Sequence, residues 1–167
     1  VEKARDAAIT GRERHVHTAR PGYLPYPQRS IRTKDYQLII NFKPDRWPLG
    51  DPYRLDGGDE PSYSLLENRT FVTLADEDAG PTKAWIVTYR NDPKIKPIYN
   101  AVYGKRPKEE LYDLKKDPDQ MNNLAINPKY SQTVKKLRQR LMKYLRETND
   151  PRLIEDGKFF ETPPMAG

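Results

Sequence analysis

The pattern that most constrains this fold is a helical repeat of apolar residues near the end of the chain. Over residues 128–148 the repeat is Val134, Leu137, Leu141, Met142, Leu145 and Thr148, and the opposite face carries Lys135, Lys136, Arg138, Arg140 and Lys143. This spacing predicts an amphipathic helix. Asn127 can cap it and Pro128 fits its first position, while "NDP" at 149–151 ends it. A helix with one apolar stripe must bury that stripe against another layer.

The sequence supplies that layer as short strands. In residues 29–42, Ile31 is followed by Tyr36, Leu38, Ile40 and Phe42, an alternation that predicts a hairpin with Lys34-Asp35 at its turn. "EELYDL", residues 109–114, predicts a further strand. The predicted fold class is therefore α+β, a small antiparallel sheet packed against the long C-terminal amphipathic helix.

The remaining segments give weaker signals. Residues 1–9 read as the end of a helix that stops at Gly11, and residues 12–20 are too charged for a buried strand. Residues 21–28 hold three Pro and predict an extended connector, because Pro lacks a backbone donor and favours extended neighbours. Residues 43–64 are predicted to be loop.

Two more segments have specific expectations. Residues 65–78 fit a short helix followed by a short strand, or a loop. Residues 78–92 predict a helix with Pro81 in its first turn and with Trp85, Ile86 and Tyr89 on one face. Trp47 and Trp85 are interpreted as core or loop anchors, and the basic face of 135–143 as solvated.

The composition limits the function classes. Hydrophobic residues make up 35% of the 167, so the core is thin, and the 11 Tyr partly compensate. The absence of Cys excludes disulfides, thiolate metal sites and Cys nucleophiles from this stretch. The net charge of +6 favours anionic partners without choosing among them. No apolar run approaches the roughly 20 residues of a membrane span, and the start, without Met or a signal-peptide core, suggests the middle of a longer chain.

One stretch resembles a known family. "ELYDLKKDPDQMNNLA", residues 110–125, followed by an amphipathic helix, resembles the C-terminal signature of the type I sulfatases of the alkaline phosphatase superfamily. Physically, the strand would close a small sheet, Asp117-Pro118 would make the turn, and Asn122 and Asn123 would satisfy loop backbone groups.

Further segments narrow the resemblance to the heparan N-sulfatases, or N-sulfoglucosamine sulfohydrolases. These segments are residues 11–52, 81–87, 104–125 and the tail "DGKFFETPPMAG". The resemblance covers nearly the whole chain but only the C-terminal third or so of such an enzyme. It implies that residues 1–28 complete a large catalytic domain, that 29–150 form the C-terminal subdomain, and that 151–167 are an irregular tail.

The resemblance also implies what should lie elsewhere. Sulfatases carry a C/S-x-P-S/A-R motif whose Cys or Ser is oxidised to formylglycine, and this chain has no such motif, since "PSYS" at 61–64 lacks the Arg. The family's Ca²⁺ ligands also belong to the upstream part. We therefore expect formylglycine and Ca²⁺ outside this chain, and no catalytic or metal-binding residue within it. The acidic runs 56–60 and 76–78 are interpreted as solvated loops.

The stretch "GRERHVHTAR", residues 11–20, leaves two interpretations open. It is either a solvated charged connector or, as the resemblance implies, a border of the substrate pocket. Arg recognises sulfate and carboxylate in forked geometry, His can donate to sugar oxygens, Glu can accept from a hydroxyl, and Gly11 would let the backbone approach closely. The predicted substrate-binding residues are Glu13, Arg14 and His15, with His17 and Arg20 as further candidates.

The resemblance implies a parent enzyme that removes sulfate from a sulfated sugar, in particular the N-sulfate of glucosamine in heparan sulfate. Its partners would be the N-terminal catalytic domain of the same chain and a sulfated glycosaminoglycan, in a periplasmic, secreted or lysosomal compartment. The alternative is a basic module that binds nucleic acid or another polyanion. Against nucleic acid, the aromatic and basic residues do not interleave in a stacking motif. A pure interaction domain is a third interpretation.

Overall fold

The structure is a computed structural model that describes residues 5–162. Residues 1–4 and 163–167 lie outside the described residues, and so do the ends of the predicted N-terminal helix and C-terminal tail. The chain divides into two interleaved compact units. The sheet unit comprises residues 1–13, 27–43 and 107–167, and the helical unit comprises residues 14–26 and 44–106. The predicted boundaries at residues 28 and 150 refer to a longer protein and stay a prediction.

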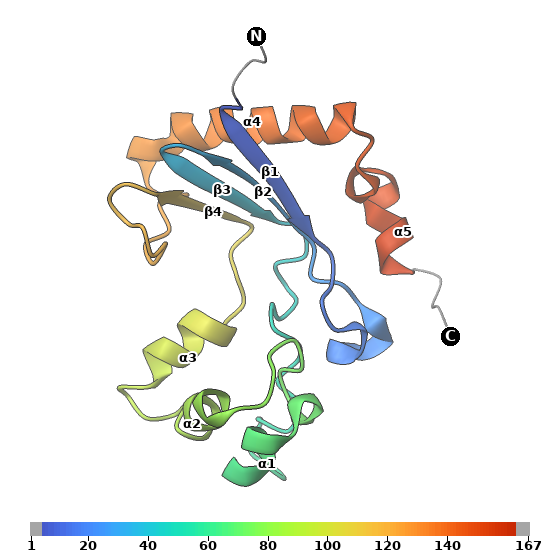
Figure 1. Cartoon of the computed structure of the whole chain (residues 1–167), viewed down its shortest axis with the longest axis vertical. Coiled ribbons are helices and arrows are strands. Elements are labelled where there is room, and N and C mark those ends of the chain that lie inside the picture. The colour runs from blue at the N-terminus through green and yellow to red at the C-terminus, as the bar shows by residue number, and fades with distance from the viewer. Residues whose placement is uncertain (1–4, 163–167) are drawn as a thin grey trace. The chain divides into compact units, whose positions relative to one another are not determined.

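The sheet unit contains a four-stranded antiparallel sheet with the order β1-β2-β3-β4 (Figure 1). The strands are β1 (Ala7–Arg12), β2 (Gln28–Thr33), β3 (Tyr36–Asn41) and β4 (Glu109–Asp113). The register places Ile9 opposite Ile31, Ile31 opposite Leu38, and Leu38 opposite Leu111. One apolar row therefore crosses all four strands on one face. The predicted α+β class, the hairpin and the strand near residue 110 are confirmed.

The expectation for the N-terminal segment was wrong. Residues 7–12, expected to follow or end a helix, form β1 instead. The segment "AAITGR" carries only Ile9 as a large apolar residue, so its own pattern specifies no strand. Its extended conformation comes from pairing with β2 along its whole length, from Ala7 opposite Thr33 to Arg12 opposite Gln28.

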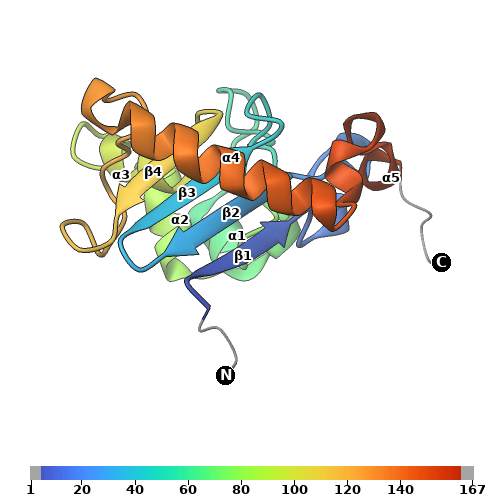
Figure 2. The same ribbon diagram turned by 90° about the horizontal axis from the view of Figure 1, so that it is seen from above.

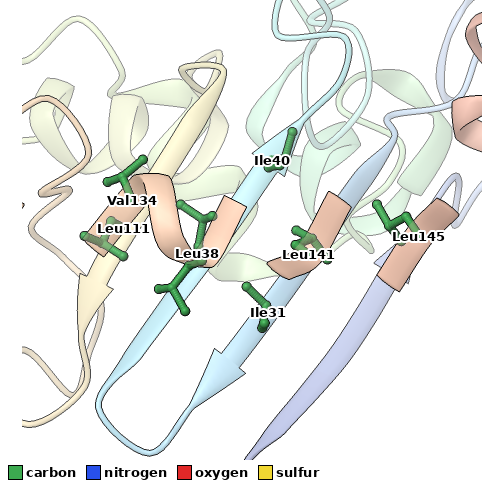
Figure 3. Close-up of a cluster of buried hydrophobic side chains, with 8 residues drawn as sticks. Ile31, Leu38, Ile40, Leu111, Val134, Leu141 and Leu145 are labelled. Atoms are coloured by element: carbon green, nitrogen blue, oxygen red, sulfur yellow. The ribbon is translucent and has the colours of Figure 1, made fainter. Parts of the chain in front are cut away.

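The long helix α4 (Ser131–Glu147) covers the apolar row (Figures 2 and 3). A short turn, η4 (Pro128–Tyr130), precedes it, and the Asn127 side chain accepts a hydrogen bond from the Lys129 amide at 3.1 Å. The buried cluster joins the helix to three of the strands through Val134, Leu137, Leu141, Leu145, Ile31, Leu38, Ile40 and Leu111. The apolar stripe of the sequence is therefore the face that this helix buries.

The sulfatase-like signature, residues 110–125, comprises most of β4, at the edge of the sheet, and the loop that follows it. The Asp117 carboxylate accepts the amides of Met121 (3.0 Å) and Asn122 (2.7 Å), which close the predicted turn. These bonds hold the pKa of Asp117 below its usual value. The side chain of Asn123 accepts from the Leu111 amide at 2.9 Å and donates to the Glu109 carbonyl at 3.1 Å. Asn123 thereby satisfies backbone groups that an edge strand would otherwise leave open.

The described part of the predicted irregular tail forms short helical turns instead. These are η5 (Pro151–Leu153), η6 (Glu155–Gly157) and α5 (Lys158–Glu161). Asp150 begins the first turn by accepting the Arg152 amide at 2.9 Å. Gly157 begins α5 with a φ of 77°, in the left-handed region that favours Gly.

The helical unit contains α1 (Tyr63–Asn68), α2 (Pro81–Thr88) and α3 (Lys96–Tyr103), with 3-10 turns η1 (His17–Ala19), η2 (Pro21–Tyr23) and η3 (Thr70–Val72). The Ser62 hydroxyl caps α1 by accepting the Leu65 amide at 3.3 Å. The core of the helical unit is separate from that of the sheet unit and is made of Leu66, Leu74, Ala84, Ile86, Val87, Ile95 and Tyr103. Residues 65–78 thus continue a helix but contain no strand.

Two features of this unit differ from the sequence analysis. The helix at 78–92 exists as α2, but its buried residues are Lys83, Ala84, Ile86 and Val87. Trp85 and Tyr89, predicted to share a core face with Ile86, are 43% and 48% exposed. The helix has only eight residues, and Ala84, Ile86 and Val87 are the members of its sequence that enter the core. Helix α3 was not predicted, because Pro97 in its first turn resembled a loop signal.

Within the described residues, no helix is both long and apolar enough to cross a bilayer.

Replacing Leu141 tests the packing of α4. Leu141 is fully buried in the sheet-unit core, so Leu141→Ala should lower the free energy of unfolding by about 2–5 kcal/mol. Urea denaturation followed by circular dichroism measures this. The control is Lys135→Ala on the exposed face of the same helix, which should change stability by less than about 0.5 kcal/mol. Equal effects would contradict the packing.

Candidate functional site

The predicted pocket segment begins in the sheet unit with Glu13, whose carboxylate lies between two Arg side chains. Its Oε1 atom accepts from Arg29 at 2.8 Å and from Nε of Arg152 at 3.2 Å, and Oε2 bonds a second nitrogen of Arg152. Arg29 comes from β2 and Arg152 from η5. Glu13 therefore ties the end of β1 to two segments that lie far away in the sequence.

Each of these Arg side chains has a second carboxylate partner. Arg29 forms a forked pair with Asp150, with nitrogen–oxygen distances of 2.6 and 2.8 Å. Arg152, whose side chain is completely buried, also donates to Glu161 at 2.7 Å. Both guanidinium groups lie against the ring of Phe160, at 5.8 and 5.4 Å from its centroid. The cluster of Glu13, Arg29, Asp150, Arg152 and Glu161 is called the arginine cluster below.

The electrostatics of the arginine cluster follow from this pairing. Burial acts to lower the pKa of Arg29, but the bonds to Asp150 and Glu13 outweigh it, so the pKa is raised. The pKa of Arg152 is raised in the same way, by Glu13 and Glu161 against burial. Arg29 in turn lowers the pKa of Asp150. Arg29, Arg152 and Asp150 are thus held ionised. Each guanidinium already has carboxylate partners, so neither can form a forked pair with a sulfate without losing one of them.

Two Gly residues make room for these Arg side chains. A Cβ at Gly11 would lie 2.8 Å from Cδ of Arg29, and one at Gly157 would clash with the guanidinium of Arg152. Gly11 was expected to allow close approach. The group that approaches it within this chain is Arg29.

A shallow cavity of about 280 Å³ adjoins the arginine cluster. It is lined by Ile9, Thr10, Gly11, Arg12, Glu13, Arg29, Tyr144, Leu145 and Asp150. Glu13 lines this cavity, but its oxygens are occupied by Arg29 and Arg152. The charged groups that line the cavity are Arg12 and Arg29 against Glu13 and Asp150. The lining therefore has no excess of positive charge that would favour a sulfate group.

The rest of the predicted segment belongs to the helical unit, and Arg20 is buried there. Arg20 donates through Nε and a terminal nitrogen to the Trp47 carbonyl at 2.9 and 2.7 Å, and to the Pro48 carbonyl at 3.0 Å. It also pairs with Asp76 at 2.9 Å. The other Asp76 oxygen accepts the Val16 amide at 2.8 Å. Arg20 and Asp76 therefore fix the turn of residues 16–20 against the loop at 47–48.

This arrangement corrects one interpretation. Asp76 belongs to an acidic run interpreted as solvated, yet it is only 8% exposed and is paired with Arg20. In residues 5–162, no three His, Asp or Glu side chains gather as a metal site would require. The described residues therefore offer no fit for the Ca²⁺ of the sulfatases.

The remaining predicted residues lie nearer the solvent. His15 and His17 are exposed, Arg14 is half-buried, and the His17 ring stacks on Tyr23 with centroids 5.8 Å apart. The structure does not gather the five predicted residues into one cluster within a unit, because Glu13 belongs to the sheet unit and the other four to the helical unit. A role for these side chains in substrate binding stays a prediction.

Arg29, Asp150 and Arg152 were not predicted from the sequence. One signal was present for Arg29, which lies two positions before Ile31 and so on the core-facing side of a strand. A charge at such a position needs a buried partner. No signal identified the partner, because Asp150 lies 121 positions away.

Comparison with known proteins gives a relative for most of the chain. Human N-sulphoglucosamine sulphohydrolase is 29% identical over 147 residues, which are 87% of this chain. The resemblance to the sulfatases is confirmed. The aligned part is 24% of that sulfatase, so the chain spans about a quarter of the relative's length, which fits a C-terminal portion. No family model matches the chain.

The low pKa of Asp150 predicts an acid-sensitive contribution to stability. A carboxylate whose pKa is lower in the folded state stabilises the fold above its unfolded pKa, ordinarily 3.8, and loses that contribution as the pH falls through the folded value. Asp150→Asn keeps the cap but breaks the pair with Arg29, and should cost about 1–3 kcal/mol at pH 7. The difference from wild type should shrink below about pH 4.

Urea unfolding at a series of pH values measures both effects. The matched control is Glu147→Gln, since Glu147 is exposed and makes only a 3.7 Å pair with Lys143. This change should cost less than about 0.5 kcal/mol at any pH. If Asp150→Asn destabilises the chain equally at pH 3 and pH 7, the loss does not come from the ion pair.

Proposed function

We propose that this chain is the C-terminal part of a sulfatase, called the parent protein below, that removes the N-sulfate of glucosamine from heparan sulfate or heparin. The single observation that carries this proposal is the similarity to the human sulphohydrolase along 87% of the chain. The human protein's name gives N-sulphoglucosamine as its substrate. In such a reaction water cleaves the nitrogen–sulfur bond and leaves a free amine and sulfate.

In this proposal the chain supplies structure and recognition. Residues 29–150, which include strands β2 to β4 and helix α4, correspond to the C-terminal subdomain of an alkaline-phosphatase-like sulfatase. Residues 1–28 complete the large catalytic domain, which is the chain's principal partner. The proposal places formylglycine and Ca²⁺ in that domain, as the resemblance to the sulfatases implies. The compartment is periplasmic, secreted or lysosomal.

Within the predicted pocket segment, the proposal assigns different roles to different residues. Glu13 and Arg20 are positioning residues, because both are held in ion pairs inside their own units. His15 is exposed and can donate a hydrogen bond to a sugar or sulfate oxygen. We therefore assign sugar recognition first to His15, with Arg14 and His17 beside it.

The chain by itself should not be a sulfatase. Sulfate hydrolysis needs a nucleophile and a group that stabilises the developing charge, and the proposal places both in the rest of the parent protein. We expect residues 1–167 to turn over neither an aryl sulfate nor N-sulfated glucosamine, even with Ca²⁺ added. The parent protein should turn over at least one of them. Turnover by the isolated chain would overturn this division of roles.

Replacing His15 in the parent protein tests its role in sugar recognition. His15→Ala should lower kcat/KM for the sugar substrate by about tenfold, the value of one hydrogen bond to a charged group. It should leave kcat/KM for a small aryl sulfate within about twofold, because that substrate lacks the sugar. Lys135→Ala, on the exposed face of α4, is the control and should affect neither substrate.

Two other results would reject that role. Equal losses on both substrates would mean that His15 acts on the sulfur chemistry. No loss on either would mean that residues 11–20 are a charged connector, the alternative left open by the sequence.

A further inference from the structure

The helical unit contains a cavity that the proposed function does not use. It has a volume of about 270 Å³ and lies among the loop at 47–56, the end of α2 and one face of α3. It is lined by Trp47, Pro52, Leu55, Asp56, Arg90, Asn91, Lys96, Tyr99 and Asn100. Small-molecule sites usually start at roughly 300 Å³, so this cavity suits one small ring and not a long segment of polymer.

Two aromatic rings in this cavity are held in place by the protein. The Tyr99 ring packs on the buried Tyr103, with centroids 5.1 Å apart. The Trp47 ring has the Lys105 ammonium 5.2 Å from its centroid, and its carbonyl accepts both bonds from Arg20. Rings fixed in this way offer apolar contact at little cost in side-chain entropy.

The polar lining residues divide into bound and available groups. Arg90 is buried and donates to the Val87 carbonyl at 3.0 Å, the Leu55 carbonyl at 3.2 Å and the Glu60 carboxylate. By contrast, the side chains of Asn91, Lys96 and Asn100 are exposed and make no hydrogen bond or ion pair with another described residue. Asp56 is also exposed and adds one carboxylate to the lining, which can accept a hydrogen bond from a hydroxyl. Arg90 is therefore a fixed wall, whereas Asn91, Lys96 and Asn100 can donate hydrogen bonds to a ligand.

Helix α3 places three of these groups together. Lys96, Tyr99 and Asn100 stand at positions i, i+3 and i+4, which share one face of an α-helix. One face of α3 thus offers a cation, an aromatic ring and an amide within one turn. A sugar ring presents a matching set, with apolar C–H groups on its face, hydroxyls at its edge and, when sulfated or carboxylated, one anionic substituent.

We propose that this cavity is a subsite for one anionic sugar residue. Trp47 and Tyr99 contact the apolar face of the ring, Asn91 and Asn100 hydrogen-bond its hydroxyls, and Lys96 pairs with its sulfate. The choice of a sugar rests on the proposed function. The subsite extends that function by adding a second point of contact with the polymer in the helical unit.

Nucleic acid fits this cavity less well. Proteins that bind single strands stack successive bases on several aromatic platforms along a basic groove. Here the two rings and the one unpaired lining cation belong to a single small cavity, in the part of the chain that the structure describes. Single-stranded DNA is therefore included in the test as the competing ligand.

The test measures binding of an N-sulfated heparin tetrasaccharide to the 167-residue chain by isothermal titration calorimetry. The variants are Lys96→Ala and Lys94→Ala, which remove the same charge from the same exposed segment, although only Lys96 lines the cavity. Lys96→Ala should raise Kd by about tenfold or more, as expected for a hydrogen bond between charged groups. Lys94→Ala should raise it by less than about twofold. A desulfated, N-acetylated tetrasaccharide should bind wild type at least about tenfold more weakly, because it lacks the N-sulfate.

An amide variant tests the sugar contacts separately. Asn100→Ala should weaken binding of both tetrasaccharides, while the matched Asn68→Ala, at the end of α1 and outside the cavity, should weaken neither. Circular dichroism of each variant should match wild type, since all four replaced side chains are exposed.

Several results would overturn the subsite. These are equal losses for Lys96→Ala and Lys94→Ala, single-stranded DNA binding as tightly with the same dependence on Lys96, or no binding of the tetrasaccharide at millimolar concentration. Turnover of N-sulfated glucosamine by the parent protein is measured separately. A parent that is active while the cavity fails this test contradicts only the subsite. A parent inactive on every sulfate contradicts the proposed function, whatever the cavity binds.

Discussion

The sheet unit depends on the ion pairs that join Glu13, Arg29, Asp150 and Arg152. The apolar row and α4 hold the middle of the unit, and Leu153 of η5 attaches the start of the segment after α4 to this core. The end of β1 and the residues around Leu153 make further contacts. There the link between the first and last parts of the unit is electrostatic, since Arg29 contacts both Glu13 and Asp150 and Arg152 contacts both Glu13 and Glu161. Removing both carboxylate partners of Arg29 or of Arg152 would leave a buried charge uncompensated, which is far more costly than losing a surface pair.

The sequence predicted those elements whose own periodicity specifies them. Helix α4 and the β2–β3 hairpin repeat apolar residues at the period of their structure, so each was found from its own residues. Strand β1 has no such pattern, because its extended conformation depends on pairing with β2. Helix α3 was not predicted, because Pro97 in its first turn is also typical of a loop. The candidate site was less predictable for the same reason. Residue types pointed to Glu13 and Arg20, but their partners Arg152 and Asp76 lie 139 and 56 positions away, where local spacing gives no information.

Much of the positive charge of the chain is paired with carboxylates inside the fold. The basic stretch at 11–20 suggested anion binding, yet Arg20 is neutralised by Asp76, and Arg29 and Arg152 are neutralised within the arginine cluster. These side chains stabilise the fold. In the proposed subsite, an external anion is bound by a cation that has no carboxylate partner. This cation is Lys96 on α3, which lines the cavity together with two fixed aromatic rings.

The two interleaved units explain how structural and recognition roles are divided along the chain. The helical unit is built from two excursions, residues 14–26 and 44–106, which leave the sheet unit after β1 and β3 and return before β2 and β4. The sheet and α4 need a fixed register, because shifting a strand by one residue would turn its apolar row away from the helix. The excursions carry no such constraint, so their loops can vary while the scaffold stays constant. Both His15 and the cavity beside α3 lie on these excursions, where a change of ligand contacts would leave the core of the sheet unit intact.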